Sequence, residues 1–124
     1  MLLAGEHPML AVLRDQLAVA EVADREFTGV GFFLNFRIPA SSPRVDKGRL
    51  VIGDVYAKLT GLEHDAGFLL FVRDGALATL ECFIVDDRWP TDPKLVRAFY
   101  MRREGSGNSA LIETNIRDLT TAFK

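Results

Sequence analysis

The sequence has only two histidines, and the surroundings of its candidate catalytic residues favour structural roles. Cys82 is the single cysteine. It lies in an apolar run that has no histidine to deprotonate it, and a thiol buried among apolar side chains has a raised pKa and is a poor nucleophile. His64-Asp65 lies in a predicted turn, where adjacent residues seldom reach the geometry of a base and its orienting acid. We therefore expect a buried, inert Cys82 and no catalytic residue.

Motifs for metals and phosphates are also missing from the sequence. Asp86, Asp87 and Asp92 bring three carboxylates close together, but they lack the glycine and glutamate positions of an EF-hand loop. The glycines form neither a dinucleotide-binding nor a P-loop pattern. The sequence predicts no metal and no cofactor.

Glu81 is a charged residue that the sequence pattern places among apolar side chains. Asp74-Gly75 separates two apolar runs, which is the strongest sequence signal for a hairpin with a type I′ turn. A two-residue turn places Glu81 opposite Phe68 on an apolar face, whereas Cys82 falls on the other face. Because an unpaired carboxylate there costs free energy, we expect an ion pair with Arg25 or Arg37.

The sequence leaves two functional hypotheses open. The first is a non-catalytic protein-interaction module of the immunity-protein type. The second is a small-molecule-binding domain, or a small enzyme, with a pocket between the sheet and the first helix. A deep pocket would favour the second hypothesis and a flat acidic face the first. The residues expected at the mouth of such a pocket are Glu81, Asp54, Tyr56, Arg25 and Trp89.

Apolar periodicity predicts an α+β fold. Pro8 can begin a helix that ends between Leu17 and Ala20, with Gln16 on its exposed side. Alternating apolar residues predict antiparallel strands, and a change of parity at Gly53-Asp54 indicates a β-bulge. We expect a meander of four to six strands, covered at least partly on both faces, with the N-terminal helix packed on it. The predicted strands lie within residues 22–38, 49–59 and 67–85. Residues 95–102 fit either a last strand, which we favour, or a short helix.

The end of the chain differs from the rest in composition. Residues 1–104 are predicted to form a single α+β domain, and residues 105–124 a flexible joint followed by a tail. Apolar residues in this tail recur at helical spacing and predict a C-terminal helix with one apolar face. That face and the open edges of the sheet predict a homodimer. The residues of the apolar face are Ile112, Ile116, Leu119 and Phe123.

Composition limits the class of protein. The 124 residues are 48% hydrophobic and 26% charged, which is typical of one globular domain. A net charge of -2 offers no basic surface for nucleic acid. The single cysteine, and the lack of a signal peptide or a long apolar run, predict a cytoplasmic protein that does not bind membranes.

Several segments resemble a group of small uncharacterised bacterial proteins. These are REFTGVGFF (25–33), GDVYA (53–57) and GFLLFVRDGALATLE (67–81), closed by Trp89-Pro90. The resemblance extends from the first helix to Pro90 and implies a bacterial, cytoplasmic, single-domain protein. Its motifs are structural, so it implies no activity and no functional residues.

Overall fold

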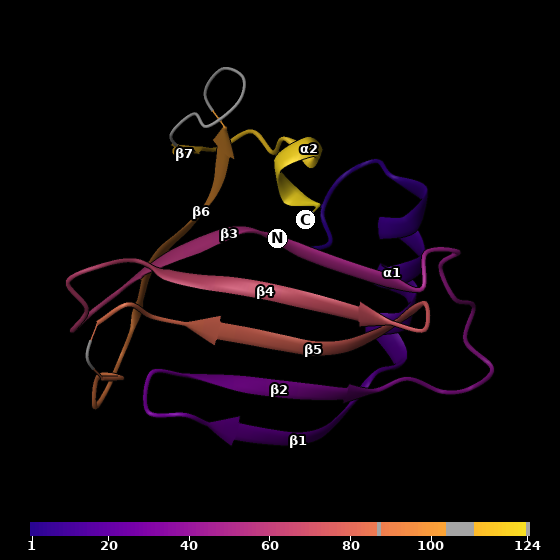
Figure 1. Ribbon diagram of the computed structural model, residues 1–124, viewed down its shortest axis with the longest axis horizontal. Helices are drawn as coiled ribbons and strands as arrows, with labels where there is room; N and C mark the ends of the chain where they lie inside the picture. Colours follow the sequence, from indigo (N-terminus) through magenta and orange to yellow (C-terminus); the bar gives the residue numbers. More distant parts are fainter. Residues whose placement is uncertain (87, 104–110, 124) are drawn as a thin grey trace.

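The computed structural model describes residues 1–86, 88–103 and 111–123 and shows an open antiparallel sheet with two helices (Figure 1). The α+β prediction is confirmed. Within the described ranges the sheet has seven strands rather than four to six, in the order β1-β2-β5-β4-β3-β6-β7. The elements are α1 (Pro8–Val19), β1 (Glu21–Phe27), β2 (Gly31–Arg37), β3 (Arg49–Leu59), β4 (Ala66–Arg73), β5 (Ala76–Phe83), β6 (Leu95–Arg103), β7 (Leu111–Thr114) and α2 (Leu119–Ala122).

Helix α1 begins as the sequence predicts but is anchored by an unexpected residue. Pro8 occupies the first turn, and the His7 side chain caps the helix by accepting a hydrogen bond from the Met9 N–H at 3.1 Å. Gln16, expected on the exposed side, is buried. Its Nε2 donates to the carbonyl of Gly75 at 3.0 Å, and its Oε1 accepts from the Leu77 N–H at 2.9 Å. The helix is thereby bonded to the β4–β5 turn.

The β4–β5 hairpin follows the predicted register only near its turn. Asp74 and Gly75 have φ values of 53° and 75°, as a type I′ turn requires. Beyond the first pairs a bulge at Ala78 shifts the register, so Glu81 lies opposite Leu69 rather than Phe68. Because one extra residue moves each later side chain to the other face, the predicted faces of Glu81 and Cys82 are wrong.

The hydrophobic core lies on one face of the sheet. Both helices pack on this face, here called the helix-bearing face (Figure 1). A helix is about 10 Å across, whereas seven strands span roughly 29 Å at about 4.8 Å between neighbours. Helix α1 can therefore cover only part of the sheet. The core on this face comprises Leu3, Leu10, Leu13, Val45, Leu50, Ile52, Leu70, Val72, Leu77 and Ala122.

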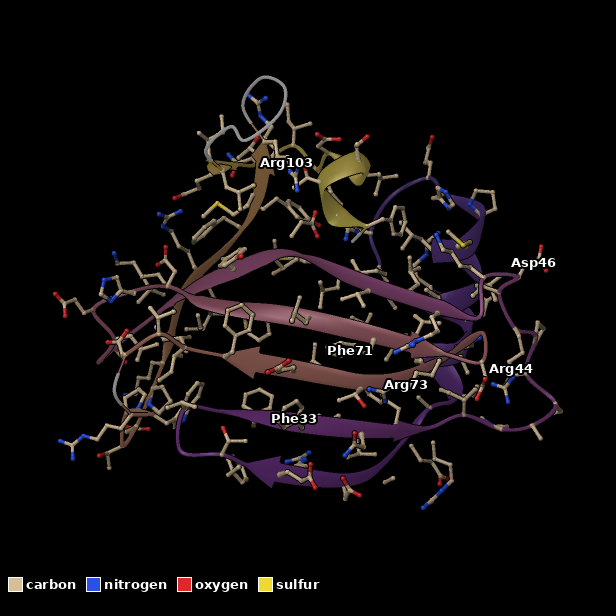
Figure 2. The ribbon with its side chains drawn as sticks, in the orientation of Figure 1. Phe33, Arg44, Asp46, Phe71, Arg73 and Arg103 are labelled. Carbon is tan, nitrogen blue, oxygen red and sulfur yellow. The ribbon has the colours of Figure 1, made fainter. Side chains whose placement is uncertain are left out.

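The opposite face carries apolar side chains shielded by polar ones, and no helix within the described ranges covers it (Figure 2). The Arg73 guanidinium lies 5.5 Å from the centre of the Phe71 ring and donates to the Thr79 hydroxyl at 3.2 Å. Thr79 in turn donates to the Asn35 amide oxygen at 2.7 Å. The expectation of cover on both faces is therefore not met by the described residues. Polar side chains take the place of a second layer.

The C-terminal residues 111–123 belong to the sheet and the core. The predicted C-terminal helix is confirmed only for Leu119–Ala122. Ile112 lies in strand β7 and Ile116 lies before the helix, so the predicted apolar face of four helical residues does not form. Phe123 forms an isolated bridge with Ile52. The predicted bulge at Gly53-Asp54 is confirmed, and Arg117 binds Asp54 there. The flexible joint predicted to follow residue 104 lies outside the described residues.

Candidate functional site: an apolar strip beside helix α1

Large apolar side chains remain exposed where α1 leaves the sheet uncovered. Leu17 at the end of α1 is 49% exposed, and Val22 and Phe27 of β1 are 45% and 76% exposed. Val22 lies opposite Phe36 of β2, and Phe27 opposite Phe32. We define the apolar strip as these residues and their neighbours on the helix-bearing face: Leu17, Val22, Phe27, Phe32, Leu34, Phe36 and Trp89.

Two glycines and a loop build one end of the strip. A Cβ on Gly31 would lie 2.0 Å from the carbonyl oxygen of Cys82, so β2 can approach β5 only with glycine there. Trp89 follows β5, and its backbone N–H donates to the carbonyl of Gly29 at 2.7 Å. The Trp89 ring meets Phe32 edge-on at 5.9 Å between ring centres, and Phe32 lies 6.4 Å from Phe27. Three aromatic rings therefore form a row at this end.

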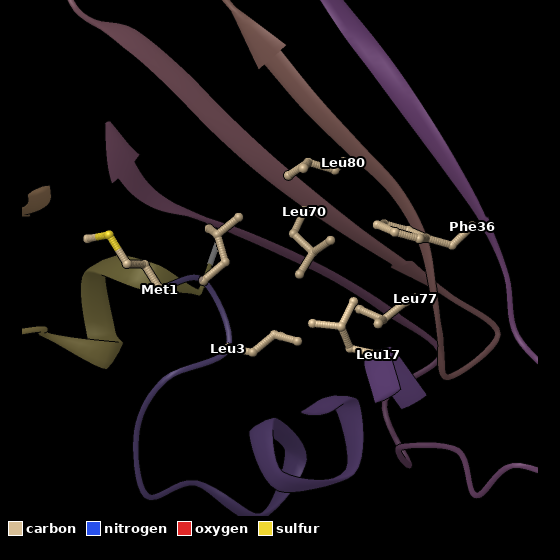
Figure 3. A pocket seen from close by; sticks show the side chains of 8 residues that line it. Met1, Leu3, Leu17, Phe36, Leu70, Leu77 and Leu80 are labelled. Carbon is tan, nitrogen blue, oxygen red and sulfur yellow. The ribbon is translucent and has the colours of Figure 1, made fainter. Parts of the chain in front are cut away.

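A groove opens at the other end of the strip, between α1, the N-terminal segment and the sheet (Figure 3). Its volume is about 190 Å³, which is below the range of about 300–1,000 Å³ common for small-molecule sites. Leu17 and Phe36 belong to both the groove and the strip, so the two surfaces are continuous. The groove is lined by Met1, Leu2, Leu3, Leu17, Phe36, Leu70, Leu77 and Leu80.

Arg25 introduces a charge beside the strip. It lies opposite Leu34 and so faces the same side as Phe27. No ion pair or hydrogen bond joins its side chain to the part of the chain that the structure describes. The acidic residues of β1, by contrast, project to the other face. There Glu21 pairs with Arg37 at 3.5 Å, and Asp24 accepts from the Asn35 amide at 2.6 Å.

The structure separates the residues that the sequence placed at one pocket. Arg25 adjoins the strip and Trp89 forms part of it. The ring of Tyr56 packs against those of Phe83 and Phe99, and the distance between ring centres is 6.5 Å in both pairs. Burial raises the pKa of the Tyr56 hydroxyl. Tyr56 and Glu81 lie on the opposite face, away from the groove. Asp54 is buried in the fold.

The predicted ion pair of Glu81 is not formed. Arg37 is paired with Glu21, and Arg25 faces the other side of the sheet. Glu81 has no ion pair with any described residue. The bulge at Ala78 places it on the uncovered face, where it is only partly buried. Solvent can hydrate the carboxylate there, so it needs no cationic partner.

Asp54 serves the fold rather than a pocket. Its carboxylate is fully buried and accepts two hydrogen bonds from Arg117, each 2.9 Å long. Arg117 also donates to the carbonyl of Ala4 at 2.6 Å and stacks over Tyr100, whose hydroxyl donates to the Met1 carbonyl. This network connects both ends of the described chain to β3. Sequence reasoning missed Arg117 because no local pattern marks an arginine as buried.

The other reactive residues have structural surroundings. Cys82 is buried, and burial is the largest cause that raises its pKa to about 11. Asp86 accepts hydrogen bonds from the N–H groups of Glu63 at 2.8 Å and His64 at 3.2 Å. These bonds, with that of Glu63 foremost, lower its pKa. Among the residues that the structure describes, no group of three or more His, Cys, Asp or Glu could hold a metal ion.

Comparisons with protein-family models, curated proteins and solved structures yielded no match. No helix in the described part of the chain is long and apolar enough to cross a membrane. Sequence reasoning did not find the apolar strip, since the pattern that places Val22 and Phe27 in a strand does not show whether anything covers them. The sequence signal that could have indicated it is the number of aromatic residues, which include nine phenylalanines. One N-terminal helix is too small to cover all of them.

Proposed function

We propose that this protein is a non-catalytic interaction module that binds a partner protein through the apolar strip. The observation that carries the proposal is the exposure of Leu17, Val22 and Phe27, which neighbour one another through the apolar side chains of β2 on the same face of the sheet. Contiguous exposed apolar surface often marks interaction sites. Aromatic residues and arginine are enriched at protein interfaces, and the strip contains four aromatic residues and has Arg25 beside it.

The shape of the surface supports a protein partner over a small ligand. The groove is small and apolar, so it suits one anchoring side chain of a partner, such as leucine or phenylalanine. This role matches the immunity-protein type of function predicted from the sequence, in which a small domain binds another protein. A small-molecule pocket near Glu81 has less support because Glu81 and the groove lie on opposite faces of the sheet.

Photo-crosslinking in cells that naturally produce the protein tests the proposal. A benzoylphenylalanine at Phe27 should crosslink a distinct protein, whereas the same group at Arg49, exposed on the opposite face, should not. With that partner purified, Phe27→Ala should weaken binding by about tenfold or more, as expected for an aromatic anchor.

Two results would overturn the proposal. One is crosslinking to a protein from Arg49 but not from Phe27. The other is binding of the purified partner that is unchanged by Phe27→Ala and by Leu17→Asp. Both variants change exposed side chains, so a thermal unfolding curve can confirm that the fold is retained.

A further inference from the structure

Strand β1 leaves one edge of the sheet open. It is the first strand in the sheet order, all of its residues are exposed, and no described strand lies beyond it (Figure 1). After an irregularity at Ala23 it pairs regularly with β2 from Asp24 to Phe27. The backbone N–H and C=O groups on its outer side can therefore pair with a further strand.

The two faces of β1 differ in charge. Asp24 and Glu26 lie opposite Asn35 and Phe33 and project away from the helices. Val22 and Phe27, which belong to the apolar strip, project to the helix-bearing face together with Arg25. One face of the edge is thus acidic, and the other is apolar apart from Arg25.

This pattern disfavours pairing between the β1 strands of two copies. In a symmetric antiparallel pair, facing residues project to the same side of the sheet. Asp24 or Glu26 would then always face an acidic residue of the second copy, and like charges directly opposite each other are destabilising. A strand with lysine or arginine on that side would instead form pairs of opposite charge.

We infer that β1 accepts an added β-strand from the partner protein, with basic side chains on one face and apolar side chains on the other. The basic residues face Asp24 and Glu26, and the apolar residues extend the strip beside Val22 and Phe27. This inference rests on the proposed function, because the added strand belongs to the partner that covers the strip. Main-chain hydrogen bonds supply affinity, and the alternating side chains supply specificity.

Model peptides test the inference without the natural partner. One blocked peptide alternates valine and lysine, and a matched peptide alternates valine and glutamate. In titrations followed by NMR, the lysine peptide should shift and protect the amides of β1. It should bind about tenfold more tightly than the glutamate peptide, because two pairs of opposite charge replace two pairs of like charge.

Charge reversal supplies the matched control. The double variant Asp24→Lys, Glu26→Lys should reverse the preference between the two peptides. The variant Asp15→Lys, Asp46→Lys makes the same change in net charge at exposed residues outside β1 and should leave the preference as it is. Equal binding of both peptides, or shifts that avoid β1, would overturn strand addition.

The natural partner separates the two proposals. Suppose that it crosslinks from Phe27 and loses affinity in Phe27→Ala but binds the double-lysine variant unchanged, with the β1 amides unprotected. Strand addition is then wrong and the interaction through the strip stands. The opposite outcome is also possible: the lysine peptide pairs with β1, but the affinity of the partner is unchanged by Phe27→Ala and by Leu17→Asp. The proposed function is then wrong, and β1 still accepts an added strand.

Discussion

Replacing Arg117 by alanine should destabilise this protein more than any other change to an ion pair in the described chain. The Asp54 carboxylate is fully buried, and the Arg117 side chain is only 8% exposed. Removing one partner leaves a buried charge without its donors, which costs about 3–5 kcal/mol. Domains of this kind have a total stability of about 5–15 kcal/mol, so the loss is a large share of it.

The assay is unfolding by heat and by urea, followed by circular dichroism. At roughly 4 °C per kcal/mol for a chain of this size, the melting temperature should fall by about 12–20 °C. Arg97→Ala is the matched control, because Arg97 also binds a carboxylate, that of Glu113, through two nitrogens. The side chains of Arg97 and Glu113 are 49% and 43% exposed, and an exposed ion pair contributes about 0–1 kcal/mol to the free energy of unfolding.

A second substitution separates the unpaired charge from the lost packing. Adding Asp54→Asn to Arg117→Ala removes the buried charge and should restore about 1 kcal/mol or more. Equal melting temperatures for Arg117→Ala and Arg97→Ala would refute the reasoning. Such a result would mean that residues 111–123 are not held against β3 in solution.

Three further predictions concern the fold and its assembly. Gln16→Ala should cost about 1–3 kcal/mol by leaving the buried Leu77 N–H unpaired, and a urea midpoint no lower than that of Asp15→Ala would contradict it. The Cys82 thiol, with its pKa raised to about 11, should react with a thiol reagent at pH 8 far more slowly in native than in denatured protein, and rapid native labelling would show that it is accessible. The homodimer expected from the sequence stays a prediction, and a monomer mass by light scattering at high micromolar concentration would contradict it.

Local chemistry is sufficient to predict the features whose causes lie within a few residues. Pro8 begins α1 because proline has the φ angle of the first helical turn and lacks an N–H that would go unpaired. Asp74 and Gly75 tolerate positive φ, so the turn between β4 and β5 can be read directly from the sequence. The bulge at Gly53-Asp54 follows from a change of apolar parity, which is also a local signal.

The register beyond the turn depends on distant residues. The residues around Ala78 all fit a strand with or without a bulge, and pairing with both β2 and β4 decides between the two. The predicted position of Glu81 is therefore wrong, although the predicted turn at Asp74-Gly75 is confirmed. The order of the strands in the sheet also depends on distant residues. The β4–β5 hairpin lies between β2 and β3 because β5 pairs with β2 and β4 pairs with β3, and these pairings join segments that are far apart in the chain.

The candidate site depends on tertiary structure alone. The sequence shows that Val22, Phe27 and Phe36 are apolar and that their segments are strands. Whether they are covered depends on the width of the finished sheet and on where a single helix of 12 residues can lie. Trp89 and Arg25 are far apart in the chain and reach the same surface only because the β1–β2 hairpin and the loop after β5 meet at Gly29. The apolar pattern of the sequence determines which residues can form a core, whereas the packed structure determines which of them remain available to bind a partner.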